Sequence, residues 1–315
     1  MKGFDGLNDQ RTRALWASAL TAILGTVAFN LIGGFIMVPL MVLEIENAAL
    51  MTIANTIAGT IAFVGIGFFC RWVTQMGNRG LRAPGLDIIP AALASLPAIF
   101  FFSAITMLFL RLLETLGLPD FAIPENYLMD APLGVQLVCV GLITPIYEEF
   151  FYRGCLQPAM EKATASRVLP ILLVSTLFAL AHGNIQALPG LLCLGIMLGC
   201  LASFTGSFWT STALHIAYNT AVVVISYGEQ ATERISEAPW YLLVANAAIW
   251  LVPLVCLAAM AYVMTAKHKR NPPKQFANHP KPKGWAALLW GVVMLGSVVW
   301  CLLTVWMTMS PELFS

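Results

Sequence analysis

Residues 88–113 read IIPAALASLPAIFFFSAITMLFLRLL and carry one charged side chain, Arg111. A helix needs about 20 apolar residues to cross the hydrocarbon core of a bilayer, and this stretch is longer than that. The whole chain is similar in character: 59% of its 315 residues are apolar and 10% are charged, against about 25% charged in soluble domains. The sequence therefore predicts an all-α, polytopic membrane helical bundle.

Apolar runs of this kind recur along the chain and predict about nine transmembrane helices. Eight are possible if the last run does not span. We expect one membrane domain over 1–315, with a Pro-rich basic cytosolic loop at 267–284 and no soluble domain. The expected spans are 14–43, 48–70, 88–113, 131–152, 167–183, 188–205, 209–227, 240–266 and 285–309.

The charges outside the spans alternate from loop to loop. Lys and Arg gather in the N-terminal tail and in every second loop after it, while the other loops are mainly acidic. Because cytoplasmic loops are enriched in Lys and Arg, we expect a cytoplasmic N-terminus. The short tails and the lack of organelle signals favour a bacterial inner (plasma) membrane. The composition excludes a soluble enzyme, a nucleic-acid binder and a disordered chain, so the expected surroundings are a lipid bilayer.

A few ionisable side chains remain inside apolar segments, where charge is costly and usually functional. Glu149 and Arg153 are four residues apart, so they share a helix face and can pair. Glu148 is rotated by about 100° from Glu149, which leaves one carboxylate available as a general base. Pro145 should leave the carbonyl of Gly141 without its helical donor and kink the helix nearby. The alternative is that both carboxylates only bracket Arg153 at a cytosolic helix end.

Two histidines and one asparagine lie in later apolar segments. His182 shares a helix face with Phe178, four residues earlier, and a lone His of this kind is often structural. His215 and Asn219 also share a face and could together donate to one oxygen atom, as an oxyanion hole requires. They could equally form a polar contact between helices. Arg111 is expected to be structural, paired with Glu114 or reaching towards the interface.

These three clusters resemble the three motifs of the CPBP family of intramembrane proteases, also called the Abi or CAAX protease family. The family's EExxxR, FxxxH and HxxxN patterns match EEFFYR at 148–153, FALAH at 178–182 and HIAYN at 215–219. The turn GSFW at 206–209 is similar to one that often precedes the third motif. Each motif is short, but all three occur in order in neighbouring apolar helices. The resemblance covers about residues 130–225, which we interpret as the catalytic core.

The resemblance implies endopeptidase activity on a membrane-bound peptide or protein. Glu148 would activate a water that His182 holds, and His215 and Asn219 would stabilise the oxyanion. Glu149 and Arg153 would support the cavity. We expect no cofactor, although zinc is possible with Glu148, His182 and His215 as ligands. The chain lacks HExxH, and Asn is a poor zinc ligand but a good oxyanion donor, so the expectation is a metal-free glutamate mechanism.

Two other functions are compatible with the same residues. A membrane transporter or proton pathway could use Glu148, His182 and His215 as a relay, although no internal repeat of the kind seen in many transporters is visible. A catalytically silent membrane scaffold is the third possibility, and the intact motifs argue against it. Nothing in the residues selects the substrate. Span counting places Glu148 near the inner end of its helix, away from His182, unless that helix runs on to about Met160.

Overall fold

The computed structural model describes residues 10–43, 47–117, 131–227, 239–264 and 284–309. Within them all regular structure is helical, apart from one isolated antiparallel bridge between Leu81 and Ser207. The first helices are α1 (Gln10–Val42), α2 (Ala48–Thr74), α3 (Ile88–Leu93) and α4 (Ser95–Thr115). A long composite helix follows, made of α5 (Leu133–Gln136), η2 (Leu137–Ile143), α6 (Thr144–Glu149), η3 (Phe150–Leu156) and α7 (Gln157–Thr164). The rest are α8 (Val168–Ala181), α9 (Leu188–Thr205), α10 (Phe208–Tyr227), α12 (Trp240–Met264) and α13 (Gly284–Met309).

The helices confirm an all-α, multi-pass membrane protein. Seven helical stretches in the described residues are long and apolar enough to cross a bilayer, and two shorter apolar stretches fall at α8 and α13. Each of the nine expected segments is helical in the structure. The orientation of the chain and the basic loop at 267–284 remain predictions, because most of the charged loops used for them lie outside the described residues.

Two of the expected segments differ in detail from the structure. The 88–113 run forms two helices, α3 and α4, which meet at Ala94. Pro97 explains the break, since proline has no N–H to donate and its ring clashes with the carbonyl four residues earlier, that of Leu93. The fourth segment does not end at residue 152 but continues to Thr164. Glu148 therefore lies near the middle of its helix. This agrees with the second expectation, that the helix runs on to about Met160.

Two prolines shape the composite helix. Each follows a π-helical stretch, η2 before Pro145 and η3 before Pro158. The residues before these prolines, Thr144 and Gln157, bond five residues back instead of four, to the carbonyls of Cys139 and Tyr152. π-Helical turns within α-helices are frequent at functional sites. The expectation that Pro145 leaves the Gly141 carbonyl without its helical donor stays a prediction.

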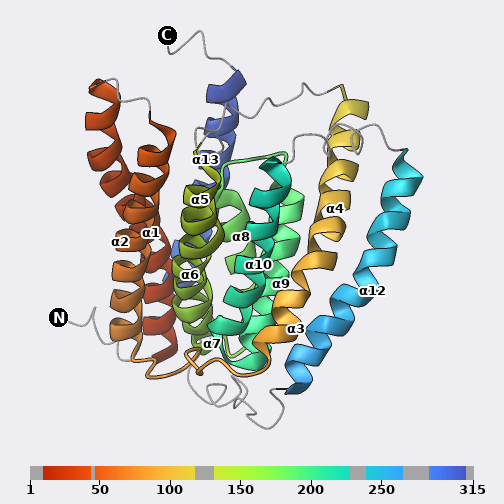
Figure 1. Cartoon of the computed structure of the whole chain (residues 1–315). Coiled ribbons are helices and arrows are strands. Elements are labelled where there is room, and N and C mark those ends of the chain that lie inside the picture. The colour runs from red at the N-terminus through yellow and green to blue at the C-terminus, as the bar shows by residue number, and fades with distance from the viewer. Residues whose placement is uncertain (1–9, 44–46, 118–130, 228–238, 265–283, 310–315) are drawn as a thin grey trace, which may run out of the picture.

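The centre of the bundle consists of the composite helix, α8, α9 and α10. In Figure 1 the α1–α2 pair lies on one side of them, and α4 with α12 lies on the other. α8 has 14 residues, a length of about 21 Å, which is short of the roughly 30 Å hydrocarbon thickness. His182 follows directly after α8 as its C-cap residue.

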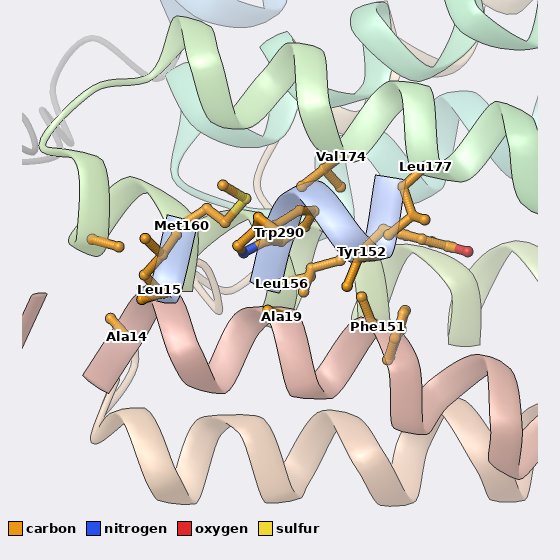
Figure 2. Packing of buried hydrophobic residues seen from close by; sticks show 14 of the residues in the cluster. Ala14, Leu15, Ala19, Phe151, Tyr152, Leu156, Met160, Val174, Leu177 and Trp290 are labelled. Atoms are coloured by element: carbon orange, nitrogen blue, oxygen red, sulfur yellow. The ribbon is translucent and has the colours of Figure 1, made fainter. Parts of the chain in front are cut away.

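An apolar core joins the first helices to the centre of the bundle. Figure 2 shows small residues of α1, among them Ala14 and Ala19, facing side chains of the composite helix, with Val174 and Leu177 of α8 on the far side of the same cluster. Trp290 of α13 packs into the same cluster, and its indole N–H donates to the Ser18 hydroxyl at 2.9 Å. The small α1 side chains let the backbones approach closely, as is usual between membrane helices.

Candidate active site

Glu149 and Arg153 form the buried centre of the site. Arg153 Nη1 donates to Glu149 Oε1 at 3.0 Å, and both side chains have no exposed surface. Arg153 also donates from Nη2 to the Gly195 carbonyl of α9, at 3.2 Å. Its guanidinium carbon lies 4.5 Å from the centre of the Phe178 ring, a favourable cation–π distance. The predicted pairing is present, and it ties the composite helix to α8 and α9.

His215 lies between the two adjacent carboxylates. Its Nδ1 is 3.1 Å from Glu149 Oε1, and its Nε2 is 3.9 Å from Glu148 Oε2. Because a carboxylate only accepts, the short contact requires a hydrogen on Nδ1. Glu149 thus fixes the orientation of the ring and leaves Nε2 facing Glu148. The rotation between the two glutamates gives them different surroundings, since the Glu148 side chain is 14% exposed and that of Glu149 is 0% exposed.

Asn219, one helical turn after His215 on α10, contacts the composite helix. Its Nδ2 donates to the Val140 carbonyl at 3.2 Å. In the π register the N–H of residue 145 would serve this carbonyl, but Pro145 has none. The Asn219 amide therefore supplies a donor to a carbonyl that residue 145 cannot serve. An Asn amide carries two hydrogens, so the second remains available to another acceptor.

His182 contacts the Phe178 ring, which in turn contacts His215. It is an exposed residue at the end of α8, and its Nδ1 lies 2.7 Å from the Phe178 carbonyl. Since a carbonyl only accepts, Nδ1 carries the hydrogen and Nε2 is left with its lone pair. The Phe178 ring lies edge-on to both imidazoles, with centroid distances of 4.7 Å to His182 and 5.8 Å to His215. The FxxxH motif therefore contributes both His182 and the Phe178 ring, which lies against the two imidazoles.

The donor atoms do not fit a zinc ion as they are arranged. A catalytic zinc takes three protein ligands at about 2.0–2.2 Å. In the ranges that the structure describes, no three His, Cys, Asp or Glu side chains converge closely enough to hold a metal ion. Glu148 and His215 approach each other, but the Phe178 ring lies beside His215 and His182 alike.

The structure thus places five of the six expected site residues in one connected cluster across the composite helix and α10. These are Glu148, Glu149, Arg153, His215 and Asn219. Three further groups complete the cluster. Two of them, the carbonyls of Gly195 and Val140, are backbone atoms that no sequence pattern indicated. The third, the Phe178 ring, is part of the FxxxH motif. Arg111 pairs with Glu114 at 3.4 Å on an exposed helix face, as expected.

Replacement of Asn219 by Leu tests whether its amide takes part in catalysis. We expect the catalytic rate to fall by about 10²- to 10³-fold, the usual loss for one oxyanion donor. Asn30→Leu is the matched control, because Asn30 donates to a backbone carbonyl of its own helix, that of Thr26, far along α1. Rates of peptide cleavage by both purified variants check this. A rate for Asn219→Leu equal to that of Asn30→Leu would remove Asn219 from the mechanism.

A comparison with protein families agrees with this geometry. Residues 131–221 match the family model for type II CAAX prenyl endopeptidase Rce1-like proteins. The matched region runs from the start of the composite helix into α10 and contains all three motifs. No curated protein and no solved structure matches the chain.

Proposed function

We propose that this chain, an intramembrane protease of the CPBP (CAAX protease) family, hydrolyses a peptide bond of a membrane-associated peptide or protein with a water that Glu148 activates. The observation that carries the proposal is the pair of carboxylates around one imidazole. Glu149 is fully buried and accepts hydrogen bonds from Arg153 and His215. Glu148 is partly exposed and lies 3.9 Å from Nε2 of the His215 ring. One carboxylate orients the histidine and the other is available for proton transfer.

The proposed reaction uses side chains of the cluster only. Glu148 takes a proton from a water held by Nε2 of His182, and the water oxygen bonds to the scissile carbonyl carbon. Hydrogens on His215 Nε2 and on the Asn219 amide stabilise the resulting oxyanion. This role requires His215 as an imidazolium ion, with its second hydrogen on Nε2. Glu148 then delivers the proton to the leaving nitrogen, and the C–N bond breaks.

The burial of the site supports a substrate that reaches it within the membrane. The composite helix crosses from Leu133 to Thr164, and its two glutamates lie near the middle of that span. A peptide attached to a lipid or to a membrane helix would be delivered at this depth. The CAAX prenyl endopeptidase name of the matching family makes a peptide with a prenylated C-terminal cysteine motif the first probe to use.

The proposal is tested with the purified protein in liposomes. Two quenched fluorescent peptides serve as probes, one with a farnesylated C-terminal CAAX sequence and one with the same sequence and no lipid. Peptides of membranes from cells that carry the wild type or Glu148→Gln are compared by mass spectrometry in parallel. Cleavage of either probe, or peptides that depend on Glu148, supports the proposal. Their absence in both experiments would contradict it.

Removal of metal ions is expected to leave cleavage unchanged within about twofold. The physical reason is the donor arrangement, in which no three candidate ligands converge in the described residues. Metal analysis of the active protein, with and without chelator treatment, makes the measurement. Stoichiometric zinc whose removal stops cleavage and whose return restores it would overturn the metal-free mechanism.

A further inference from the structure

The loop between α2 and α3, residues 75–87, runs beneath the two helices that carry the cluster. In Figure 1 it passes along the lower end of the bundle, below α7 and α10. It lies outside the region that matches the protease family. Its contacts with each helix are direct, and they involve backbone atoms as well as charged side chains.

The loop is bonded to the start of α10, the helix of His215 and Asn219. The Gly80 carbonyl accepts from the Phe208 N–H at 3.0 Å, and Leu81 forms the isolated bridge with Ser207. The Ser207 hydroxyl donates to the Arg82 carbonyl at 2.8 Å and accepts from the Trp209 N–H. The first turn of α10 is thus capped by a side chain that the loop holds.

Asp87 adds a charged contact to the same turn. It is almost fully buried, accepts from Arg82 Nη2 at 2.6 Å and accepts from the Thr210 hydroxyl. Burial alone would raise the pKa of this carboxyl, but the hydrogen bonds from Arg82 and Thr210 outweigh it and hold the pKa below its ordinary value. A carboxylate near a helix N-terminus also interacts favourably with the helix dipole.

The loop is packed equally closely on the helix of Glu148 and Glu149. Arg71, at the end of α2, donates from Nη1 to the carbonyls of Arg79 and Gly154, at 3.0 and 2.6 Å. In an α-helix the Gly154 carbonyl would accept from residue 158, but that residue is a proline. A Cβ on Gly80 would lie 3.1 Å from Pro158 Cγ, 3.5 Å from the Arg153 carbonyl oxygen and 3.6 Å from that of Gly154. Gly80 therefore touches both helices at once.

We propose that the α2–α3 loop sets the spacing between the composite helix and α10, and that Gly80 and Asp87 are positioning residues for the cleavage reaction. The inference rests on the proposed function. Gly80 is a spacer of minimal size, with its carbonyl on α10 and its Cα against Pro158. A methyl group there would push the two helices apart and widen the 3.9 Å gap between Glu148 and His215.

Gly80→Ala and Gly77→Ala form a matched pair for the test. Both glycines have positive φ, +78° and +53°, so Ala brings a comparable backbone strain of about 1–2 kcal/mol at each. A Cβ at Gly77 meets nothing within 4 Å. We expect Gly80→Ala to lower kcat for the fluorescent peptide by about 3- to 10-fold, because the new methyl group requires a shift of a few tenths of an ångström, and displacements near 1 Å can cost about 10²-fold. KM should change by less than about twofold, and Gly77→Ala should retain the wild-type kcat.

Asp87→Asn gives a second, milder test in the same assay. The Asn keeps an acceptor for Thr210 but loses the charge that binds Arg82, so we expect a smaller drop in kcat with KM again unchanged. The Gly80→Ala/Asp87→Asn double variant should lose less than the product of the two single losses, because one spacing is disturbed twice. If Gly80→Ala does not accumulate, Asp87→Asn decides. Full kcat in folded Gly80→Ala or Asp87→Asn, or a loss confined to KM, would overturn the inference. A wild type that cleaves nothing would instead overturn the proposed function.

Discussion

Replacement of Glu148 by Gln is expected to lower peptide cleavage by about 10²- to 10⁴-fold, the usual contribution of a general base. Gln is nearly the same size but cannot take a proton from water. Glu148 is the partly exposed carboxylate of the pair and approaches His215 at 3.9 Å, whereas the close contacts to Arg153 and His215 are made by Glu149. The variant should therefore insert into the membrane normally and have the same midpoint of thermal unfolding as the wild type. Initial rates with the fluorescent peptide in liposomes make the measurement.

Glu114→Gln is the control for this change. Glu114 also lies on a membrane helix and pairs with an arginine, but its side chain is 71% exposed and distant in sequence from the motifs. Cleavage by Glu114→Gln should match the wild type. If Glu148→Gln cleaves at the same rate as Glu114→Gln, Glu148 is not the base.

Replacement of Arg153 by Met is expected to destabilise the protein by about 3–5 kcal/mol, which is typical when one partner of a buried ion pair is removed. The loss leaves the Glu149 carboxylate buried with no exposed surface and without its cation. It also removes the bond to the Gly195 carbonyl and the packing on Phe178. Thermal unfolding of the detergent-purified variants measures the effect.

Arg111→Met provides the matched comparison for Arg153→Met. The Arg111–Glu114 pair has similar geometry along a helix, at 3.4 Å, but its side chains are 37% and 71% exposed. Exposed pairs of this kind contribute about 0–1 kcal/mol, so the midpoint of unfolding should hardly change. The double variant Glu149→Gln/Arg153→Met should be more stable than Arg153→Met alone, because no isolated charge remains. Equal stability of Arg153→Met and Arg111→Met would show that the buried pair does not hold the bundle together.

The fold and the buried ion pair of the site followed from local sequence patterns. Apolar runs of membrane length predict helices because a lipid-exposed backbone must satisfy its own hydrogen bonds. The Glu149–Arg153 pair was predictable in the same way, since spacing by four residues on a helix fixes which side chains meet. The Arg111–Glu114 pair followed from similar reasoning. Each of these features depends on residues that are close in sequence.

The features that the sequence did not predict depend on contacts between distant segments. That His215 would meet both glutamates depends on how α10 packs on the composite helix, and helical spacing within either segment says nothing about it. The bond from Asn219 to the Val140 carbonyl was not predictable either, because it joins α10 to the π-helical stretch η2. By sequence, Arg71 and Arg82 are two of the positive charges between the second and third expected spans, and such charges indicate only the orientation of the chain. In the structure they bond to backbone groups of the composite helix and of the α9–α10 turn.

A single-turnover reaction in H₂¹⁸O tests the central claim, peptide hydrolysis by a Glu148-activated water, most directly. The purified wild type in liposomes is mixed in excess over the farnesylated peptide, and the masses of the products are measured by mass spectrometry. We expect two peptide fragments, with one ¹⁸O in the new C-terminal carboxylate, and no fragments with Glu148→Gln. Fragments without the label, or labelled fragments from Glu148→Gln at the wild-type rate, would contradict it.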